Sequence, residues 1–238
     1  MNNLTDQTLS AIVLEHHELV PVLEKYNLDF CCRGKRPLGE ACAEKNISLE
    51  TILPELEAAM SPSPAGMDFS AMTPDQLIGY IVLRHHFYVR QALPVIEAHV
   101  AKVVTKHGGR YPYMQKVQAL FTEVQQELIP HLYKEENILF PRIKEIAAAA
   151  GRTGIPAGYI HAPIAVMEHE HDHAGQLMFA IREITGNYTP PADACTTHRV
   201  CLEELKAFEN DLHQHVHLEN NILFPKAALL MQAEATEA

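Results

Sequence analysis

Apolar and polar residues do not alternate with a period of two over any long stretch of this chain, and long segments show helical spacing instead. A period of two marks a half-buried strand, whereas recurrence every three to four residues marks an amphipathic helix. We therefore expect an all-α protein. Four long helices with modest connections predict an antiparallel four-helix bundle. They cover about residues 73–107, 112–150, 157–185 and 191–232.

Local signals mark several helix ends. Thr73–Pro74 is a capping residue followed by proline at the first helical position. Gly108–Gly109 is expected to end the first long helix and Gly186–Asn187 the third. Pro130 and Pro141 are candidate kinks in the second, because an interior proline removes a backbone donor.

The first part of the chain predicts shorter helices. Residues 9–26 carry an apolar stripe with a candidate break at Pro21, Pro37 can open a helix, and another begins near Ser48. The proline-rich residues 61–66 are typical of a linker. The expected organisation is a small helical domain over residues 1–58, a linker over 59–73 and the bundle over 74–238.

Composition narrows the function classes. Hydrophobic residues form 47% of the 238, so a packed core is expected. The formal net charge of −11 argues against binding to nucleic acid or to an anionic membrane surface, which both need a basic footprint. No apolar run reaches the length of a membrane span, and the first residues lack the positive region of a secretory signal. We expect a cytoplasmic protein whose five cysteines are reduced.

Histidine is over-represented, with 15 residues against eight tyrosines and eight phenylalanines. A histidine surplus in an acidic protein suggests metal binding. An internal repeat sharpens this: the segments 131–141 and 215–225 match at an offset of 84 residues, each with His-x3-Glu before Asn-Ile-Leu-Phe-Pro. His86 and His171 lie 45 and 44 residues before the two repeats.

The repeat predicts a two-metal site. Residues four apart share one helix face, so each His-x3-Glu pair can project into the bundle core. A carboxylate has two oxygens and can bridge two ions. Four imidazoles with two bridging glutamates suit a pair of iron ions best, and two Fe(II) ions less two glutamates leave a net charge of +2. The candidate ligands are His86, His131, Glu135, His171, His215 and Glu219.

These motifs resemble the hemerythrin-like domain, and their order is similar to that in the di-iron proteins that repair iron-sulfur clusters. The matching stretches are residues 81–86, 131–141, 167–172, 190–197 and 215–225, together with the N-terminal segment. The resemblance implies four terminal histidine ligands, bridging Glu135 and Glu219, and an oxo or hydroxo group between the irons.

Other histidines and glutamates lie near these ligands. His85, His169, His173, His213 and His217 are adjacent to or two residues from a ligand, so helical geometry turns them elsewhere and we expect packing or surface positions. Two glutamates are candidates to orient an imidazole or line an access path: Glu127, one turn before His131, and Glu170, directly before His171.

Cys31 and Cys32 resemble the N-terminal motif of the same repair proteins, which reads Cys-Cys-Gly-Gly. Arg33 stands at the third position, where a positive φ would strain it. The basic residues 33, 35 and 36 are expected to favour thiolate, so the pair is a candidate for reactive thiols. We expect no zinc site at two adjacent cysteines, and structural roles for Cys195 and Cys201.

The resemblance implies a stress protein that helps to restore iron-sulfur clusters damaged by nitric oxide or oxidants, by supplying labile iron, by handling NO, or both. Its partners would be damaged iron-sulfur proteins and the small ligands NO or O2. Two alternatives remain open: a hemerythrin-like O2 or NO carrier or sensor, and a di-iron NO reductase. The sequence leaves open whether the protein is a true enzyme and whether it forms a homodimer.

Overall fold

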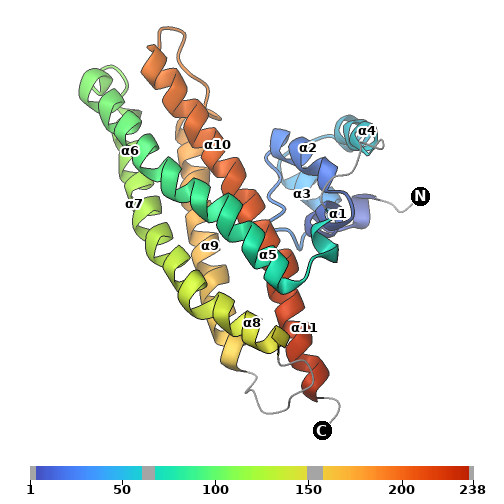
Figure 1. The fold of residues 1–238 in the computed structure, drawn as a ribbon. Coiled ribbons are helices and arrows are strands. Elements are labelled where there is room, and N and C mark those ends of the chain that lie inside the picture. The colour runs from blue at the N-terminus through green and yellow to red at the C-terminus, as the bar shows by residue number, and fades with distance from the viewer. Residues whose placement is uncertain (1–3, 61–67, 149–157, 236–238) are drawn as a thin grey trace.

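The computed structural model describes residues 4–60, 68–148 and 158–235, and all regular structure in them is helical, as predicted. Four long arms run antiparallel in a bundle, and the shorter N-terminal helices pack on one side of it (Figure 1). The arms are α5 (Pro74–Ile81) with α6 (Phe87–His107), α7 (Tyr113–Lys134) with α8 (Phe140–Ala148), α9 (Gly158–Ile184), and α10 (Thr196–Leu218) with α11 (Phe224–Ala235).

A π-helical turn interrupts three of the four arms. These turns are Val82–His86, Glu135–Leu139 and Glu219–Leu223. Pro130 lies inside α7, so the irregularity in the second arm falls at its π turn and not at that proline. A π turn carries an extra residue and re-aims the side chains around it, and such turns are frequent at functional sites.

The ends of the four long arms follow the predicted signals with one exception. Thr73 and Gln76 form a capping box at the start of α5, and α6 ends at His107 before the two glycines. The fourth arm begins at Thr196 rather than near Pro191. The reason is a turn in which the amide of Ala194 donates to the Pro191 carbonyl. The Arg199 guanidinium of α10 donates to the carbonyls of Ala194 and Pro191 and so stabilises this turn.

Four short helices form the N-terminal part: α1 (Leu9–Glu15), α2 (Val20–Lys25), α3 (Leu38–Glu44) and α4 (Leu49–Ala59). The predicted break within residues 9–26 falls at His16, and Pro21 instead lies in the first turn of α2, where its missing amide costs nothing. Single 3-10 turns cover Leu4–Asp6, His17–Leu19 and Phe69–Ala71. The candidate linker 61–66 lies outside the described residues. No described helix is both long and apolar enough to cross a membrane.

Two apolar clusters form the core. The larger one joins α1–α4 to α6, α7, α9 and α10, from Leu9 and Phe30 to Leu132 and Val216. The smaller one fills the other end of the bundle, around Ile81, Leu139 and Leu223. Each arm passes from one cluster to the other through a short polar stretch, so the bundle holds a buried polar layer between two apolar ones.

The loop that follows α2 is closed by a glycine. A Cβ at Gly34 would lie 2.1 Å from the Phe30 carbonyl oxygen, so only glycine fits without a backbone shift. The Gly34 carbonyl accepts the Ser10 amide at 2.9 Å and the Ser10 hydroxyl at 3.0 Å, which ties this loop to α1.

We predict that Gly34→Ala lowers the free energy of unfolding by about 1–3 kcal/mol, because the loop must open to admit the methyl group. Denaturant unfolding of the full chain measures it. The matched control is Gly79→Ala on α5, where a Cβ meets nothing within 4 Å. Equal stability of the two variants would contradict the close contact at Gly34.

Candidate metal centre

Six buried polar side chains converge in the layer between the two apolar clusters. Two sets of possible ligands form there, and in each set the ligand atoms all lie within 4.8 Å of one another. Both sets contain Glu135 and Glu219, and none of the six side chains is more than 2% exposed. The first set adds His86 and His215, and the second adds His131 and His171.

The repeated sequence builds two equivalent pieces of backbone. His131 and His215 lie in the last turns of α7 and α10, and Glu135 and Glu219 each begin a π turn. Proline follows each turn and has no amide to donate to the carbonyl four residues earlier. This missing hydrogen bond interrupts the α-helical ladder and favours the wider turn that starts at each glutamate.

The imidazoles meet in pairs, with their Nε2 atoms inward. His86 Nε2 lies 3.1 Å from His215 Nε2, and His131 Nε2 lies 3.1 Å from His171 Nε2. Two nitrogens this far apart and each about 2.1 Å from one ion subtend about 95° at it. That angle is close to the 90° of an octahedral ion, so the geometry favours a higher coordination number than four.

Each carboxylate faces both pairs of imidazoles. For Glu135, Oε2 lies 3.3 Å from His86 Nε2 and Oε1 lies 3.2 Å from His131 Nε2. For Glu219, Oε1 lies 3.3 Å from His215 Nε2 and Oε2 lies 3.1 Å from His171 Nε2. One oxygen of each glutamate therefore points to one set and the second oxygen to the other, as two bridging carboxylates require.

The donor set fits a pair of cations. Both carboxylates are fully buried, and their four oxygens lack a hydrogen bond of normal geometry in the described chain, although imidazole nitrogens lie close by. A buried carboxylate without compensation costs several kcal/mol. The four imidazole nitrogens and four carboxylate oxygens point at two positions, and this mixture of ligands suits divalent transition-metal ions.

The charges in this layer shift several pKa values. Burial opposes ionisation of His131, but the charge of the nearby Glu135 carboxylate and the hydrogen bond to Glu170 outweigh it and raise its pKa to about 10. Burial likewise acts to raise the pKa of Glu135, and the charge of His131 with the close approach of the imidazoles holds that pKa well below its usual range. In the metal-free protein, protons on imidazole thus compensate the glutamates, and cations would displace them.

Three of the four imidazoles have an acceptor behind them. His86 Nδ1 donates to Glu136 at 2.7 Å, His131 Nδ1 to Glu170 at 2.9 Å, and His171 Nδ1 to Asn220 Oδ1 at 2.9 Å. Such partners orient the ring and raise its basicity as a ligand. Lys134 also pairs with Glu170, and Arg90 with Glu136 at 2.8 Å.

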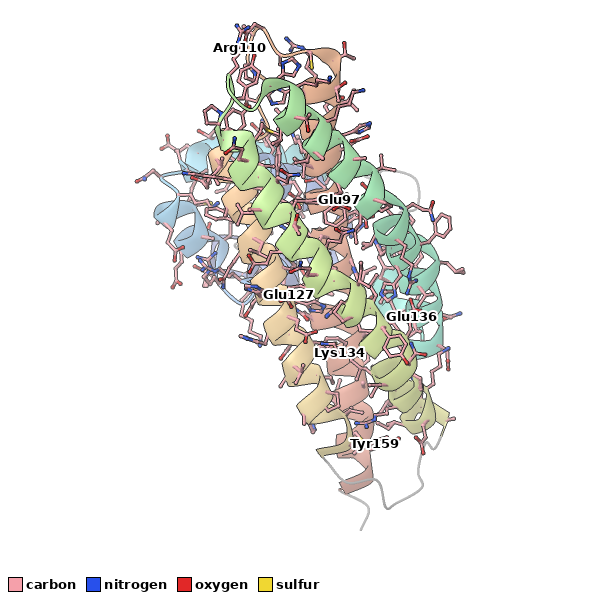
Figure 2. The ribbon with its side chains drawn as sticks, turned by 90° about the vertical axis from the view of Figure 1, so that its left-hand side faces the viewer. Glu97, Arg110, Glu127, Lys134, Glu136 and Tyr159 are labelled. Atoms are coloured by element: carbon pink, nitrogen blue, oxygen red, sulfur yellow. The ribbon has the colours of Figure 1, made fainter. Side chains whose placement is uncertain are left out.

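Glu170 therefore lies behind an imidazole, as its position before His171 suggested, whereas Glu127 has no such contact. Figure 2 labels Glu127, Lys134 and Glu136 on the second arm. Within the described chain Glu127 is half-buried and makes no hydrogen bond or ion pair, so orientation of an imidazole by Glu127 is not seen. Sequence reasoning missed Glu136 and Asn220, although each directly follows a candidate bridging glutamate.

His215 is the exception among the four. Its Nδ1 is buried without a hydrogen-bond partner in the described chain. His85 occupies the position that matches Glu170 in the repeat, and its ring stacks on His215 with centroids 5.7 Å apart. His85 is buried, as a packing role requires, and its Nδ1 lies 3.1 Å from Asp211 Oδ1. The internal symmetry thus holds for the inner side chains and breaks behind them.

The two adjacent cysteines lie directly behind a ligand helix. Cys32 Sγ is 3.8 Å from the His171 carbonyl oxygen, and the Asn221 side chain faces the Cys31 carbonyl at 3.5 Å. Arg33 has no positive φ, so it is not strained at the position of the usual glycine.

The prediction of a thiolate is wrong for Cys31. The hydrogen bond to Cys32, burial and the Asp29 charge raise the pKa of this thiol well above normal.

Two histidines next to the ligands anchor the N-terminal part. His213 Nδ1 lies 2.7 Å from Glu24 Oε1, and the ring of Phe30 packs edge-on against His213 and His217. His169 is exposed and His173 Nε2 lies 3.3 Å from Glu123, away from the six side chains. Cys195 precedes α10, and burial raises the pKa of Cys201 to about 12.

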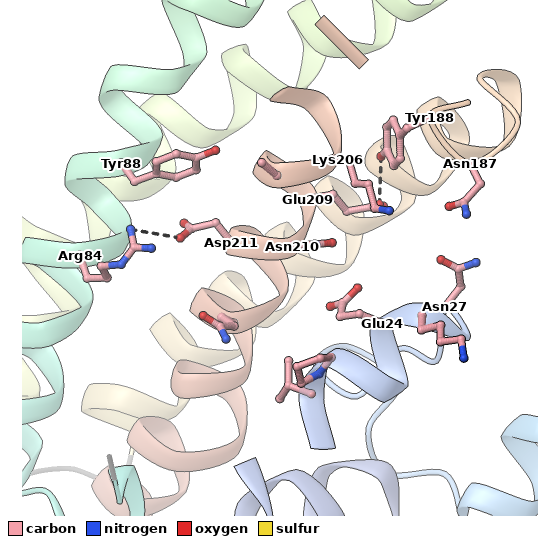
Figure 3. Close-up of a pocket in the computed structure, with 15 residues that line it drawn as sticks. Glu24, Asn27, Arg84, Tyr88, Asn187, Tyr188, Lys206, Glu209, Asn210 and Asp211 are labelled. Carbon is pink, nitrogen blue, oxygen red and sulfur yellow. Dashed lines mark hydrogen bonds and ion pairs between the residues drawn. The ribbon is translucent and has the colours of Figure 1, made fainter. Parts of the chain in front are cut away.

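A cavity of about 720 Å³ lies between α2, α6 and α10 rather than at the six side chains. Figure 3 shows Glu24 and Asn27 on one side of it, with Arg84 and Asp211 across from them. Charges of both signs line it, including the Arg84–Asp211 pair at 3.7 Å. It contains none of the six candidate ligands and neither cysteine of the pair.

Comparison with known proteins gives the family. The model of the hemerythrin HHE cation-binding domain matches residues 78–227. The chain belongs to the hemerythrin family. A second model, ScdA_N, a domain of unknown function, matches residues 5–60. The iron-sulfur cluster repair proteins YtfE of Enterobacter sp. strain 638, Shigella boydii serotype 4 and Escherichia coli O17:K52:H18 are each 35% identical over 222 residues, which is 93% of this chain and 96% of theirs.

The resemblance seen in the sequence is thereby confirmed, and the chain carries a hemerythrin domain of the cation-binding type. The described residues place the side chains able to hold cations in the buried layer of this bundle.

We predict that divalent cations stabilise the hemerythrin bundle. An ion present at about 100 times its Kd adds about 2.7 kcal/mol, or about 5–10 °C in Tm for a chain of this size. Thermal unfolding of the chelator-treated protein with and without added Fe(II) measures the shift. His171→Ala should lose most of it, whereas exposed His169→Ala should keep it; an equal shift in both variants would place the ions elsewhere.

We predict that the two cations of the hemerythrin domain leave at different rates. Both imidazoles of the His131–His171 side have an acceptor behind them, whereas His215 has none, and such partners change metal affinity about 10–100-fold. Release to a chelator should be biphasic. Glu170→Gln should speed the slow phase and leave the fast one unchanged, and Glu168→Gln on the same helix should change neither. A single phase in the unmodified protein would refute the difference.

Proposed function

We propose that this protein is a di-iron protein that takes part in the repair of iron-sulfur clusters damaged by nitric oxide or oxidants. The observation that supports it is the pair of cation positions built from four imidazoles and two shared, fully buried carboxylates. The name of the YtfE relatives, iron-sulfur cluster repair protein, points to the same role.

The proposed terminal ligands are His86, His131, His171 and His215, and the proposed bridges are Glu135 and Glu219. Iron suits this set because it accepts both imidazole and carboxylate and favours the near-octahedral angle between the nitrogens. Two Fe(II) ions with two carboxylates keep a net charge of +2. This low ligand charge favours the ferrous state and easy loss of iron over strongly oxidising chemistry.

Iron held in this way would supply ferrous ions for cluster rebuilding and a place to bind NO. The chain's own residues control access to it. Leu139, Phe140 and Phe224 cover the layer on one side and Leu132 and Val216 on the other, which keeps bulk water from the six side chains. The acceptors Glu136, Glu170 and Asn220 hold three rings in place, as described above.

We propose the same division of labour along the chain that the sequence suggested: a Cys-Cys domain over residues 1–58 and the iron-bearing bundle over 74–238. The contact of Cys32 with the His171 carbonyl supports a shared task for the two parts. A plain oxygen carrier has no use for a thiol pair beside its metal ligands.

The function is tested by reactivation of an iron-sulfur enzyme that NO has inactivated. We expect anaerobically purified protein to contain about two irons per chain and to restore activity, since two bridging carboxylates hold two ions. Glu135→Ala should lose most of the iron and most of the repair. His169→Ala serves as the matched control and should retain both.

The alternatives give different results in the same experiment. Reversible O2 or NO spectra with iron that never reaches the damaged enzyme would identify a carrier or sensor and reject the repair role. Sustained production of N2O with an electron donor, again without reactivation, would identify an NO reductase. Absence of iron after anaerobic loading with Fe(II) would remove the basis of all three.

A further inference from the structure

The adjacent cysteines form a third group of potential ligands in the described chain. Asp29, Cys31 and Cys32 each offer a ligand atom, and these atoms lie within 4.8 Å of one another. The group shares no residue with the two sets in the bundle. Both thiols are free, with the Sγ atoms 3.7 Å apart.

The sulfur separation matches that of two thiolates on one tetrahedral ion. Metal–sulfur bonds of about 2.3 Å and a sulfur separation of 3.7 Å subtend about 107° at the ion, close to the tetrahedral angle. The spacing in this loop therefore allows both sulfurs to reach one ion, although we expected no zinc site at two adjacent cysteines. The backbone bends at Cys31 and Cys32, and the two side chains leave it with their Sγ atoms at this separation.

The loop holds this geometry before any ion arrives. Asp29 Oδ1 accepts the amides of Cys31 at 3.1 Å and Cys32 at 2.9 Å, and the Cys31 thiol also points at this oxygen at 3.1 Å. Gly34 closes the other end of the loop against Phe30, as shown above. A preorganised pair of ligands loses little conformational entropy when it binds.

The surroundings leave room for an ion. A cavity of about 320 Å³ borders all three residues and is also lined by Asp172 and Gln176 of α9. The same cavity is bordered by four basic residues and by acidic residues that include Glu44 and Glu209. Arg36 pairs with Glu44 and Arg182 with Glu209, so the lining carries no excess of positive charge that would repel a cation. The cavity gives a fourth coordination position to solvent or to a thiolate of an acceptor protein.

We propose that Asp29, Cys31 and Cys32 form a third metal site, which holds one thiophilic divalent cation outside the bundle. Binding replaces two S–H bonds by two metal–sulfur bonds and releases two protons to solvent through the cavity, so the charge balances. Thiolate with carboxylate suits Fe(II) and Zn(II) rather than Mg(II) or Ca(II).

The site lies on the far side of α9 from the di-iron position, with Cys32 Sγ 3.8 Å from the carbonyl of His171. On the basis of the proposed function, the ion held here in the working protein is ferrous iron on its way from the bundle to a damaged cluster. Exchange of the fourth ligand for an acceptor's thiolate would pass the ion on without a change of oxidation state.

Cobalt(II) tests the site in the full chain, because a thiolate ligand gives a sulfur-to-cobalt charge-transfer band that histidine and glutamate cannot give. We expect about three Co(II) ions per chain and a thiolate band, as the two bundle sets and this group would provide. The variant with both Cys31→Ser and Cys32→Ser should lose the band and one ion. Cys195→Ser, at the start of α10, is the matched control and should change neither.

Two further variants separate this proposal from the proposed function. Glu135→Ala should lose bundle cobalt and keep the thiolate band, so the site is testable even if repair fails. Asp29→Asn keeps an oxygen for the two amides but loses the charge. It should weaken the affinity of the site for Co(II), measured from the thiolate band, about tenfold or more. A thiolate band that is absent in the unmodified protein, or that survives the double cysteine variant, would overturn the third site whatever the repair assay shows.

Discussion

The rest of this structure depends on two carboxylates that are buried in the middle of a helical bundle. Glu135 and Glu219 are fully buried between two apolar clusters, where an uncompensated charge is very costly. Four imidazoles surround them, and imidazole protons or metal cations must supply the positive charge. The π turns, the acceptors behind the rings and the apolar caps above and below all serve to keep these two side chains ionised and away from water.

The internal repeat explains the symmetry of this layer, and its imperfection makes the surroundings of the two halves unequal. Both repeats supply His-x3-Glu followed by a proline, so both give a π turn that begins at a buried glutamate. Behind the rings the halves differ, since Glu170 holds His131 whereas His85 only stacks on His215. The two positions therefore differ in how their imidazoles are held in place.

The N-terminal part belongs to the same physical unit as the bundle. Its helices share the larger apolar cluster with α6, α7, α9 and α10, and Glu24 and Phe30 dock on His213. This docking places the Cys32 thiol against the carbonyl of a candidate iron ligand, His171. The raised pKa of Cys31 disfavours a resting thiolate nucleophile, whereas the spacing of the two sulfurs suits a single tetrahedral ion that displaces the protons.

The sequence by itself determined the helical class, most helix ends and the six inner side chains, because each rests on local geometry: the helical period, a cap, or two residues four apart. It missed the start of the fourth arm, the partners Glu136 and Asn220, and the state of Cys31. Those depend on which side chains tertiary packing brings together, as in the contact between Cys32 and His171, 139 residues apart. Burial and neighbouring charges exist only after the arms and the N-terminal helices have docked, so only the tertiary structure decided them.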